Sequence, residues 1–278
     1  MIRPHLWVLV WGLVVMPVLA TALEVRGVFS QGGYVVGETQ PHATITASNG
    51  ERTLTTTANA DGLFVLGLDR DAASTLTVKT PSGNTTIPIT AVEYNIQRIN
   101  GLPPSQVSPV NPKLLKRIRA EAKLKRQGYA SQADVAGFAQ TFIPPVTGPV
   151  TGAFGNQRVL NGEPKRPHYG VDIAAPKGSP IVAPADGIVS LANNDMHYEG
   201  GLVFLDHGQG LVSVYLHMDS VAVKAGQRVK QGEVLGTVGA KGRATGPHLC
   251  WRMRWQGQNM DPSLWLDDGF TDPAKTAD

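Results

Sequence analysis

Histidines, one aspartate and the only cysteine gather in the later part of the 278-residue chain. His168 and Asp172 stand four residues apart in RPHYGVD, His217 lies in SVYLHM, and Cys250 follows His248 by two residues in TGPHLCWRMRW. A catalytic zinc ion takes three protein ligands of these types and keeps a fourth position open. The remaining histidines would then transfer the proton and stabilise the developing oxyanion. The joint pattern therefore favours metal-assisted hydrolysis.

Taken one at a time, these residues have ordinary explanations. A histidine or aspartate in a loop is usually solvated, and His217 on a strand is compatible with a hydrogen-bonded core histidine. His197 and His207, in NDMHYEGG and LDHGQG, belong with turns. Only the combination of residue types in one region points to chemistry.

The segment around Cys250 alternates polar and apolar residues, which predicts a strand with two distinct faces. His248, Cys250, Arg252 and Arg254 would share one face, and the apolar residues between them the other. A strand with this pattern presents positions i and i+2 to the same site. Cys250 is thus either a metal ligand or the mark of a degenerate site.

Composition favours a folded, turn-rich β protein. Hydrophobic residues make up 42% and charged residues 17%, with 31 glycines and 20 prolines. A formal net charge of +3 is too small to indicate nucleic-acid binding. With one cysteine, the chain has no intramolecular disulfide.

Residues 1–22 have the features of a cleaved export signal. Arg3 gives a positive start, an apolar run follows, and a small-x-small pattern ends at Ala22. The alternative is a membrane anchor, but Pro17 interrupts a run shorter than the ~20 apolar residues of a spanning helix. We therefore expect a mature chain from Leu23 in the periplasm or cell envelope, without a stable transmembrane segment.

The turn signals divide the rest of the chain. Short alternating runs separated by Asn-Gly, Asp-Gly and Ser-Gly predict a small β-sandwich first, and Gly-punctuated strands predict a second β-rich domain later. We expect an all-β fold with a sandwich accessory domain at 23–99, a Pro-rich linker and basic helix at 100–145, a second domain at 146–266 and a polar tail at 267–278.

The basic helix is predicted from Asn111 as N-cap, Pro112 in the first turn and Gly128 near its end. Seven basic residues and one acid lie between Lys113 and Arg126. Packing of an otherwise solvated helix on its neighbour is one interpretation. Contact with an anionic polymer or lipid surface of the envelope is the other.

Residues 146–266 resemble the lysostaphin-type (LytM-like) zinc metallopeptidases, which cut peptidoglycan cross-bridges. The similarity lies in GAFGNQRVLNGEPKRPHYGVDIAAPKGSPIVAPADGIV, YLHM, VKAGQRVKQGEVLGTVGAKGRATGPHLCW and DPSLWL. It implies an antiparallel β-sheet of the duplicated hybrid motif kind, Zn²⁺ as cofactor and peptidoglycan as partner. Cell-envelope regulators are further candidate partners.

The resemblance also assigns roles. By it, His168 and Asp172 are zinc ligands, and His217 and His248 are catalytic without binding the metal. The family's third ligand is the second histidine of His-x-His, and Cys250 holds that position. Cysteine is a competent zinc ligand, and its longer bond, ~2.3 Å against ~2.0–2.1 Å for nitrogen, partly offsets its shorter side chain.

Two functions follow from this substitution. One is an exported zinc-dependent endopeptidase that hydrolyses peptidoglycan cross-links in cell-wall remodelling. The other is a weak or inactive relative that binds peptidoglycan or activates another hydrolase. A third class, lipoyl-type and phosphocarrier domains, shares only a strand-turn-strand arrangement with VKAGQRVKQGEVLGTVG and ranks last.

Substrate contacts are expected on either side of the site. Asn161 and Arg158 precede the first expected ligand and would shape the substrate groove. Arg252 and Arg254, on the site-facing side of the predicted strand, would contact carboxylates of the stem peptide. Simple solvation of these arginines is the alternative.

Overall fold

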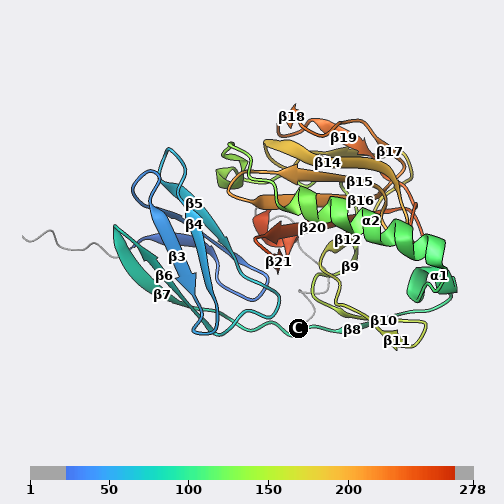
Figure 1. Ribbon diagram of the computed structural model, residues 1–278, viewed down its shortest axis with the longest axis horizontal. Helices are drawn as coiled ribbons and strands as arrows, with labels where there is room; N and C mark the ends of the chain where they lie inside the picture. The colour runs from blue at the N-terminus through green and yellow to red at the C-terminus, as the bar shows by residue number, and fades with distance from the viewer. Residues whose placement is uncertain (1–22, 267–278) are drawn as a thin grey trace, which may run out of the picture.

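The computed structural model describes residues 23–266. Strands dominate it, which confirms the all-β class (Figure 1). The expected export signal at 1–22 and polar tail at 267–278 lie outside the described residues. None of the helices among the described residues has both the length and the apolar character needed to cross a bilayer.

The first part of the chain forms two small antiparallel sheets, drawn in blue to teal at one end of the molecule (Figure 1). Val35, Ile45, Phe64 and Val78 of these strands are fully buried. One sheet has the order β1-β2-β5, with β1 Val25–Val28, β2 Tyr34–Glu38 and β5 Leu63–Gly67. The other has the order β4-β3-β6-β7, with β3 Thr44–Ser48, β4 Thr53–Thr57, β6 Thr75–Thr80 and β7 Gly83–Pro88.

The segment that follows runs along the second part of the molecule and pairs with it. Strand β8 (Ile96–Ile99) pairs in parallel with β10 (Gln157–Leu160), and β10 pairs with β11 (Glu163–Pro164). A short helix α1 (Pro104–Val107) comes next. Residues 96–99 are therefore built into a sheet with residues more than fifty positions later.

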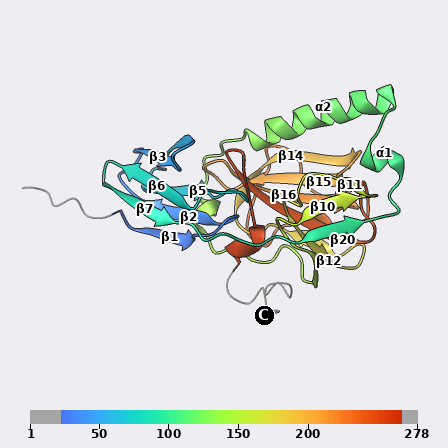
Figure 2. The same ribbon diagram turned by 90° about the horizontal axis from the view of Figure 1, so that it is seen from below.

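Helix α2 (Pro112–Tyr129) covers one face of the large sheet (Figure 2). Asn111 caps it by accepting hydrogen bonds from the backbone N–H groups of Lys113 and Leu114. Near its end, Gly128 permits a close approach, because a Cβ there would lie 2.8 Å from the Phe204 ring. A 3-10 turn, η1 (Gly137–Ala139), follows.

An eight-stranded antiparallel sheet forms the body of the second part, in the order β18-β14-β15-β16-β20-β12-β9, with β21 beside β20. Its strands are β9 Val150–Gly152, β12 Val171–Ala174, β14 Gly187–Met196, β15 Gly200–Asp206, β16 Leu211–Met218, β18 Arg228–Val229, β20 His248–Trp255 and β21 Gln258–Met260. Every residue of β15 and β16 is buried, since both faces of these central strands are covered.

A smaller sheet and a final turn complete the fold. The smaller sheet has the order β13-β19-β17, with β13 Pro180–Val182, β17 Ser220–Val221 and β19 Val234–Thr237. The turn η2 (Pro262–Trp265) brings Trp265 into a stack on Tyr34, with ring centroids 4.0 Å apart. This contact, with Asn259 bonded to Asp69, joins the N-terminal sheets to the end of the large sheet.

Candidate metal centre

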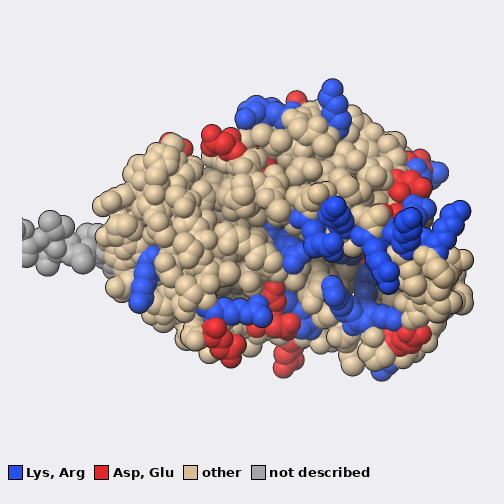
Figure 3. Space-filling model, viewed as in Figure 1, with Lys and Arg blue, Asp and Glu red and all other residues tan. Residues whose placement is uncertain are grey.

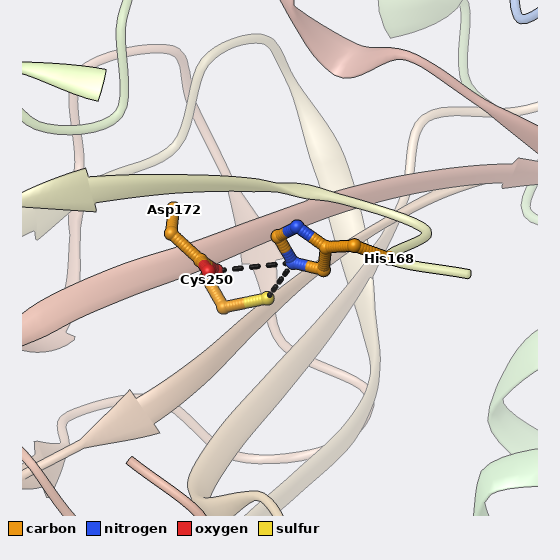
Figure 4. A group of neighbouring side chains, drawn as sticks. All are labelled: His168, Asp172 and Cys250. Carbon is orange, nitrogen blue, oxygen red and sulfur yellow. Dashed lines mark hydrogen bonds and ion pairs between the residues drawn. The ribbon is translucent and has the colours of Figure 1, made fainter. Parts of the chain in front are cut away.

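Strand pairing brings the three candidate ligands together. Asp172 on β12 lies directly opposite Cys250 on β20, and directly opposite pairs have Cβ atoms about 4.5–5.5 Å apart. His168 stands just before β12, four residues ahead of Asp172. The ligand atoms of all three lie within 4.8 Å of one another. Figure 4 shows these side chains pointing toward one another.

The alternation of β20 turns Cys250 toward this group. Leu249, Trp251, Met253 and Trp255 are at most 1% exposed and pack into the apolar core on the other face. Burial of this face determines the register of β20, because a one-residue slip would exchange the two faces and turn Cys250 away from the group. The strand predicted from sequence is therefore present, with Cys250 on the predicted face.

The donor atoms fit a zinc ion. His168 Nε2 lies 3.1 Å from Asp172 Oδ1 and 3.4 Å from Cys250 Sγ. Asp172 Oδ1 is buried and accepts no hydrogen bond from any residue between 23 and 266, which is costly for a carboxylate oxygen in the interior. His168 Nδ1 donates to the Ala153 carbonyl at 3.2 Å, so the Nε2 lone pair of the neutral ring faces the other two ligands. Imidazole nitrogen, carboxylate oxygen and thiolate sulfur are all zinc ligands.

Asp172 and Cys250 each also contact an arginine. Arg158 Nη2 donates to Asp172 Oδ2 at 2.8 Å, and Arg252 Nε donates to Cys250 Sγ at 3.5 Å. Burial alone would raise the pKa of Asp172, but His168 and Arg158 hold that pKa well below its usual range. Burial would lower the pKa of His168, yet the charges of Asp172 and Cys250 outweigh it and raise that pKa. The group is therefore embedded in positive charge.

His217 and His248 lie side by side next to this group, with ring centroids 4.8 Å apart. His217 Nδ1 donates to the Lys241 carbonyl and His248 Nδ1 to the Gly246 carbonyl, each at 2.8 Å. In the neutral rings both Nε2 atoms are consequently free to accept a proton. His248 Nε2 lies 3.8 Å from Asp172 Oδ1.

Burial keeps both imidazoles neutral at pH 7. It lowers the pKa of His217 to about 4 and lowers that of His248 as well. His217 also has a φ of 64°, a left-handed conformation that is uncommon for residues other than glycine. Such strain persists only where the surroundings enforce it, and it is frequent at functional sites.

Two recesses open onto these residues. A small pocket of about 40 Å³ is lined by Arg158, Asp172, His217 and His248, with Ile99 and Leu102 from the preceding segment on its wall. A larger groove of about 760 Å³ reaches His217 from the side of α2. Asp172 and both further histidines thus border these recesses.

Among the remaining residues singled out from sequence, Arg158 and Arg252 line the groove, and Arg158 also lines the small pocket. Asn161 lies in an exposed turn, where its side chain donates to the Leu102 carbonyl at 2.7 Å and accepts from the Leu102 N–H at 3.1 Å. It holds the segment after β8, and its contact with substrate stays a prediction.

Comparison with known proteins identifies the domain around this centre. A family model described as Peptidase family M23 matches residues 166–262. Residues 166–262 form a peptidase family M23 domain. The matched range includes His168, Asp172, His217, His248 and Cys250. The family resemblance predicted from sequence is confirmed.

Named relatives are similar over part of their length. The cell division protein DipM of Caulobacter vibrioides is 38% identical over 131 residues, 45% of this chain and 21% of that protein. The peptidoglycan DD-endopeptidase ShyC of Vibrio cholerae is 34% identical over 139 residues, 50% of this chain and 29% of that protein. The chain thus spans less than a third of the length of these relatives.

A solved structure is similar beyond the M23 domain. The crystal structure of an M23-type peptidase from Pseudomonas aeruginosa has a TM-score of 0.64 and 28% sequence identity. The match covers 86% of this chain and 95% of that chain. The similarity in fold therefore includes residues that precede the M23 domain.

Sequence reasoning missed the contacts that arginines make to the candidate ligands. Arg158 on β10 reaches Asp172, and Arg252 turns back to Cys250, its neighbour two positions away on the same face of β20. The i, i+2 spacing was a usable signal for Arg252. No local sequence pattern predicts the contact of Arg158 with Asp172, because this contact depends on how β10 folds against β12.

Proposed function

We propose that the protein is an exported zinc-dependent endopeptidase that hydrolyses peptide cross-links of peptidoglycan in the cell envelope. The observation that carries this proposal is the convergence of His168, Asp172 and Cys250 beside two neutral histidines, one of which also lines a groove. The M23 domain and the relative named as a peptidoglycan DD-endopeptidase support the reaction class and the substrate.

In this proposal, His168 Nε2, Asp172 Oδ1 and Cys250 Sγ hold Zn²⁺. The ion, when bound, polarises the scissile carbonyl and makes water a stronger nucleophile. The two negative charges of Asp172 and Cys250 would cancel the charge of the ion. Arg158 and Arg252, which contact these two ligands, add positive charge beside them and so favour the developing oxyanion.

His248 is the candidate general base, because its neutral Nε2 atom lies 3.8 Å from Asp172 Oδ1 of the ligand group. Proton transfer from the attacking water gives an imidazolium next to the reacting carbonyl, which stabilises the oxyanion and can then protonate the departing amine. His217, 4.8 Å away between ring centroids, is positioned to share the charge or relay the proton. Its buried ring keeps its own Nε2 unprotonated before the reaction.

One observation favours a second candidate function, a non-hydrolytic protein that binds peptidoglycan or activates another hydrolase. Cys250 replaces the histidine that the family resemblance implies as third ligand. A thiolate donates more charge to the ion than an imidazole does, so the bound water would be less acidic. The two functions differ in zinc-dependent product formation.

Digestion of purified sacculi tests the proposal. The mature chain, loaded with zinc, should release muropeptides cut within the peptide cross-links, identified by mass spectrometry of the soluble products. His248→Ala should bind zinc normally and release at least 100-fold less product. His42→Ala, on an exposed turn of the N-terminal sheets, is the matched control and should act like the unchanged chain. Zinc binding without products, together with stimulation of a second hydrolase, would establish the alternative.

A further inference from the structure

The charged residues that line the groove beneath α2 are almost all positive. Its floor is formed by residues of β16 and β20, one wall by α2, and the opposite wall by the loop between β10 and β12. Figure 3 shows Lys and Arg side chains gathered along and below α2 around a hollow. The charged lining residues are one acid, Glu199, and eight bases: Lys125, Arg126, Arg158, Lys165, Arg166, Arg243, Arg252 and Arg254.

Three of these cations are neutralised by carboxylates of the protein. Lys125 pairs with Glu199, the single acid of the groove. Arg158 pairs with Asp172 at 2.8 Å. Lys165 pairs with Glu163 and is the only other lining cation that pairs with a carboxylate among the described residues. The remaining lining cations have no such partner, so the groove keeps a net positive charge.

Four of the arginines that line the groove lack such partners. Among residues 23–266, no carboxylate pairs with Arg126, Arg166, Arg252 or Arg254. The Arg254 guanidinium lies over the Tyr129 ring at 4.8 Å, and its Nε is buried without any hydrogen-bond acceptor. Arg254 lines the groove and its guanidinium has no hydrogen-bond or carboxylate partner among the described residues, so its groove-facing N–H groups can donate to a ligand.

We propose that this groove binds free carboxylates of the peptide substrate, and that Arg254 on β20 and Arg126 on α2 are its specificity-determining residues. The inference rests on the proposed endopeptidase function and deepens it. Guanidinium groups bind carboxylates bidentately, and the aromatic face of Tyr129 holds one of them in a fixed orientation. Helix α2 precedes residues 166–262, so this wall is a feature that the M23 family match does not account for.

The shape of the basic surface favours a peptide over a lipid bilayer. The cations line a recess, and the same recess reaches His217 and the residues beside Cys250. A peptide chain that lies along the floor can therefore place one bond at the histidines and its carboxylates at the arginines. The headgroups of a bilayer form a broad plane, which would contact α2 from outside and leave the groove floor unoccupied.

Kinetics on two matched peptides test this proposal. One is a synthetic cross-linked stem peptide with its free carboxylates, and the other carries carboxamides in their place. For the zinc-loaded full chain, amidation should raise KM about tenfold with little change in kcat, a reduced value for charge-assisted hydrogen bonds in a partly exposed groove. In Arg254→Gln and in Arg126→Gln the ratio of the two KM values should fall to about twofold or less, because the guanidinium that binds the carboxylate is removed.

The control lies on the same helix. Arg119→Gln removes an exposed charge of α2 that does not line the groove, and it should keep the tenfold ratio. The ratio is taken within one protein, so a partial folding defect in a variant affects both peptides alike and leaves it unchanged. Equal KM values for both peptides in the unchanged chain, or an undiminished ratio in Arg254→Gln, would overturn the inference.

Failure of the proposed function has a different signature. If neither peptide is cut, binding of each is measured by titration calorimetry. Tighter binding of the carboxylate peptide, lost in Arg254→Gln, would sustain the groove assignment without the reaction. Equal binding of both peptides would reject it. Sedimentation with phosphatidylglycerol vesicles covers the lipid alternative: binding that requires Arg254 and Arg126, with no preference between peptides, would assign the groove to a membrane surface instead.

Discussion

His207 makes the stability of the fold depend on pH in a calculable way. Its ring is fully buried, Nδ1 donates to the Asp186 carbonyl at 2.9 Å, and Nε2 accepts from Ser213 Oγ at 2.7 Å. Burial lowers its pKa from 6.5 to about 4. A difference of this size between the unfolded and folded states corresponds to about 3 kcal/mol of unfolding free energy.

The sign follows from proton uptake. Above pH 6.5 the ring is neutral in both states, and its contribution is complete. Between pH 6.5 and pH 4 the unfolded chain takes up a proton that the folded chain refuses, so the unfolding free energy falls. Below about pH 4 both states are protonated, and no further loss arises from this group.

Urea unfolding at several pH values between 7 and 4 measures this contribution. His207→Gln keeps a neutral donor and acceptor of similar reach but does not titrate. Its unfolding free energy should be lower overall, and the decrease in that free energy between pH 7 and pH 4 should be smaller than in the unchanged chain by about 3 kcal/mol. His42→Asn, at an exposed turn, should leave the pH dependence unchanged. Parallel pH profiles for His207→Gln and the unchanged chain would refute the reasoning.

The remaining predictions concern the metal centre and the mature chain. A Cβ on Gly152 would lie 2.5 Å from Asp172 Oδ2, so Gly152→Ala should weaken zinc binding about tenfold or more, as measured by competitive chelator titration. Gly246→Ala is the control, because a Cβ there would meet no atom of the described residues within 4 Å. Equal zinc affinities of the two variants would contradict this prediction. Cys250→Ser should lose zinc, measured by plasma mass spectrometry, whereas Cys250→His should keep zinc and preserve or raise activity on sacculi; full zinc occupancy in Cys250→Ser would make the thiol a bystander. N-terminal sequencing of envelope-extracted protein should begin at Leu23, and a chain that still starts at residue 1 would disprove cleavage.

Part of the site could be predicted because it depends on local periodicity. The alternation from His248 to Trp255 is a property of neighbouring residues, and one face of it is apolar enough to determine the register of the strand. The His-x-x-x-Asp spacing likewise places His168 and Asp172 on one side of a single segment. Turn signals between short alternating runs were sufficient for the all-β class.

Other features depend on pairings between distant segments, for which a single sequence has no local signal. The parallel pairing of β8 with β10 joins residues about sixty positions apart, and it brings Leu102 to Asn161 and to the pocket wall. The groove beneath α2 likewise exists only after the helix has packed on the sheet. His207 was assigned to a turn, and it does stand before one, just after β15. Its burial beside Phe142 and its hydrogen bond with Ser213 across the hairpin depend on how the chain folds.

The central claim is that Cys250 binds the catalytic metal together with His168 and Asp172, and cobalt substitution tests it most directly. Replacing zinc with Co²⁺ in the full chain makes a metal–thiolate bond visible as a charge-transfer absorption in the near ultraviolet. We expect this absorption at one cobalt ion per chain, and its loss in Cys250→Ser. Cobalt bound at the same stoichiometry without thiolate absorption would contradict the claim.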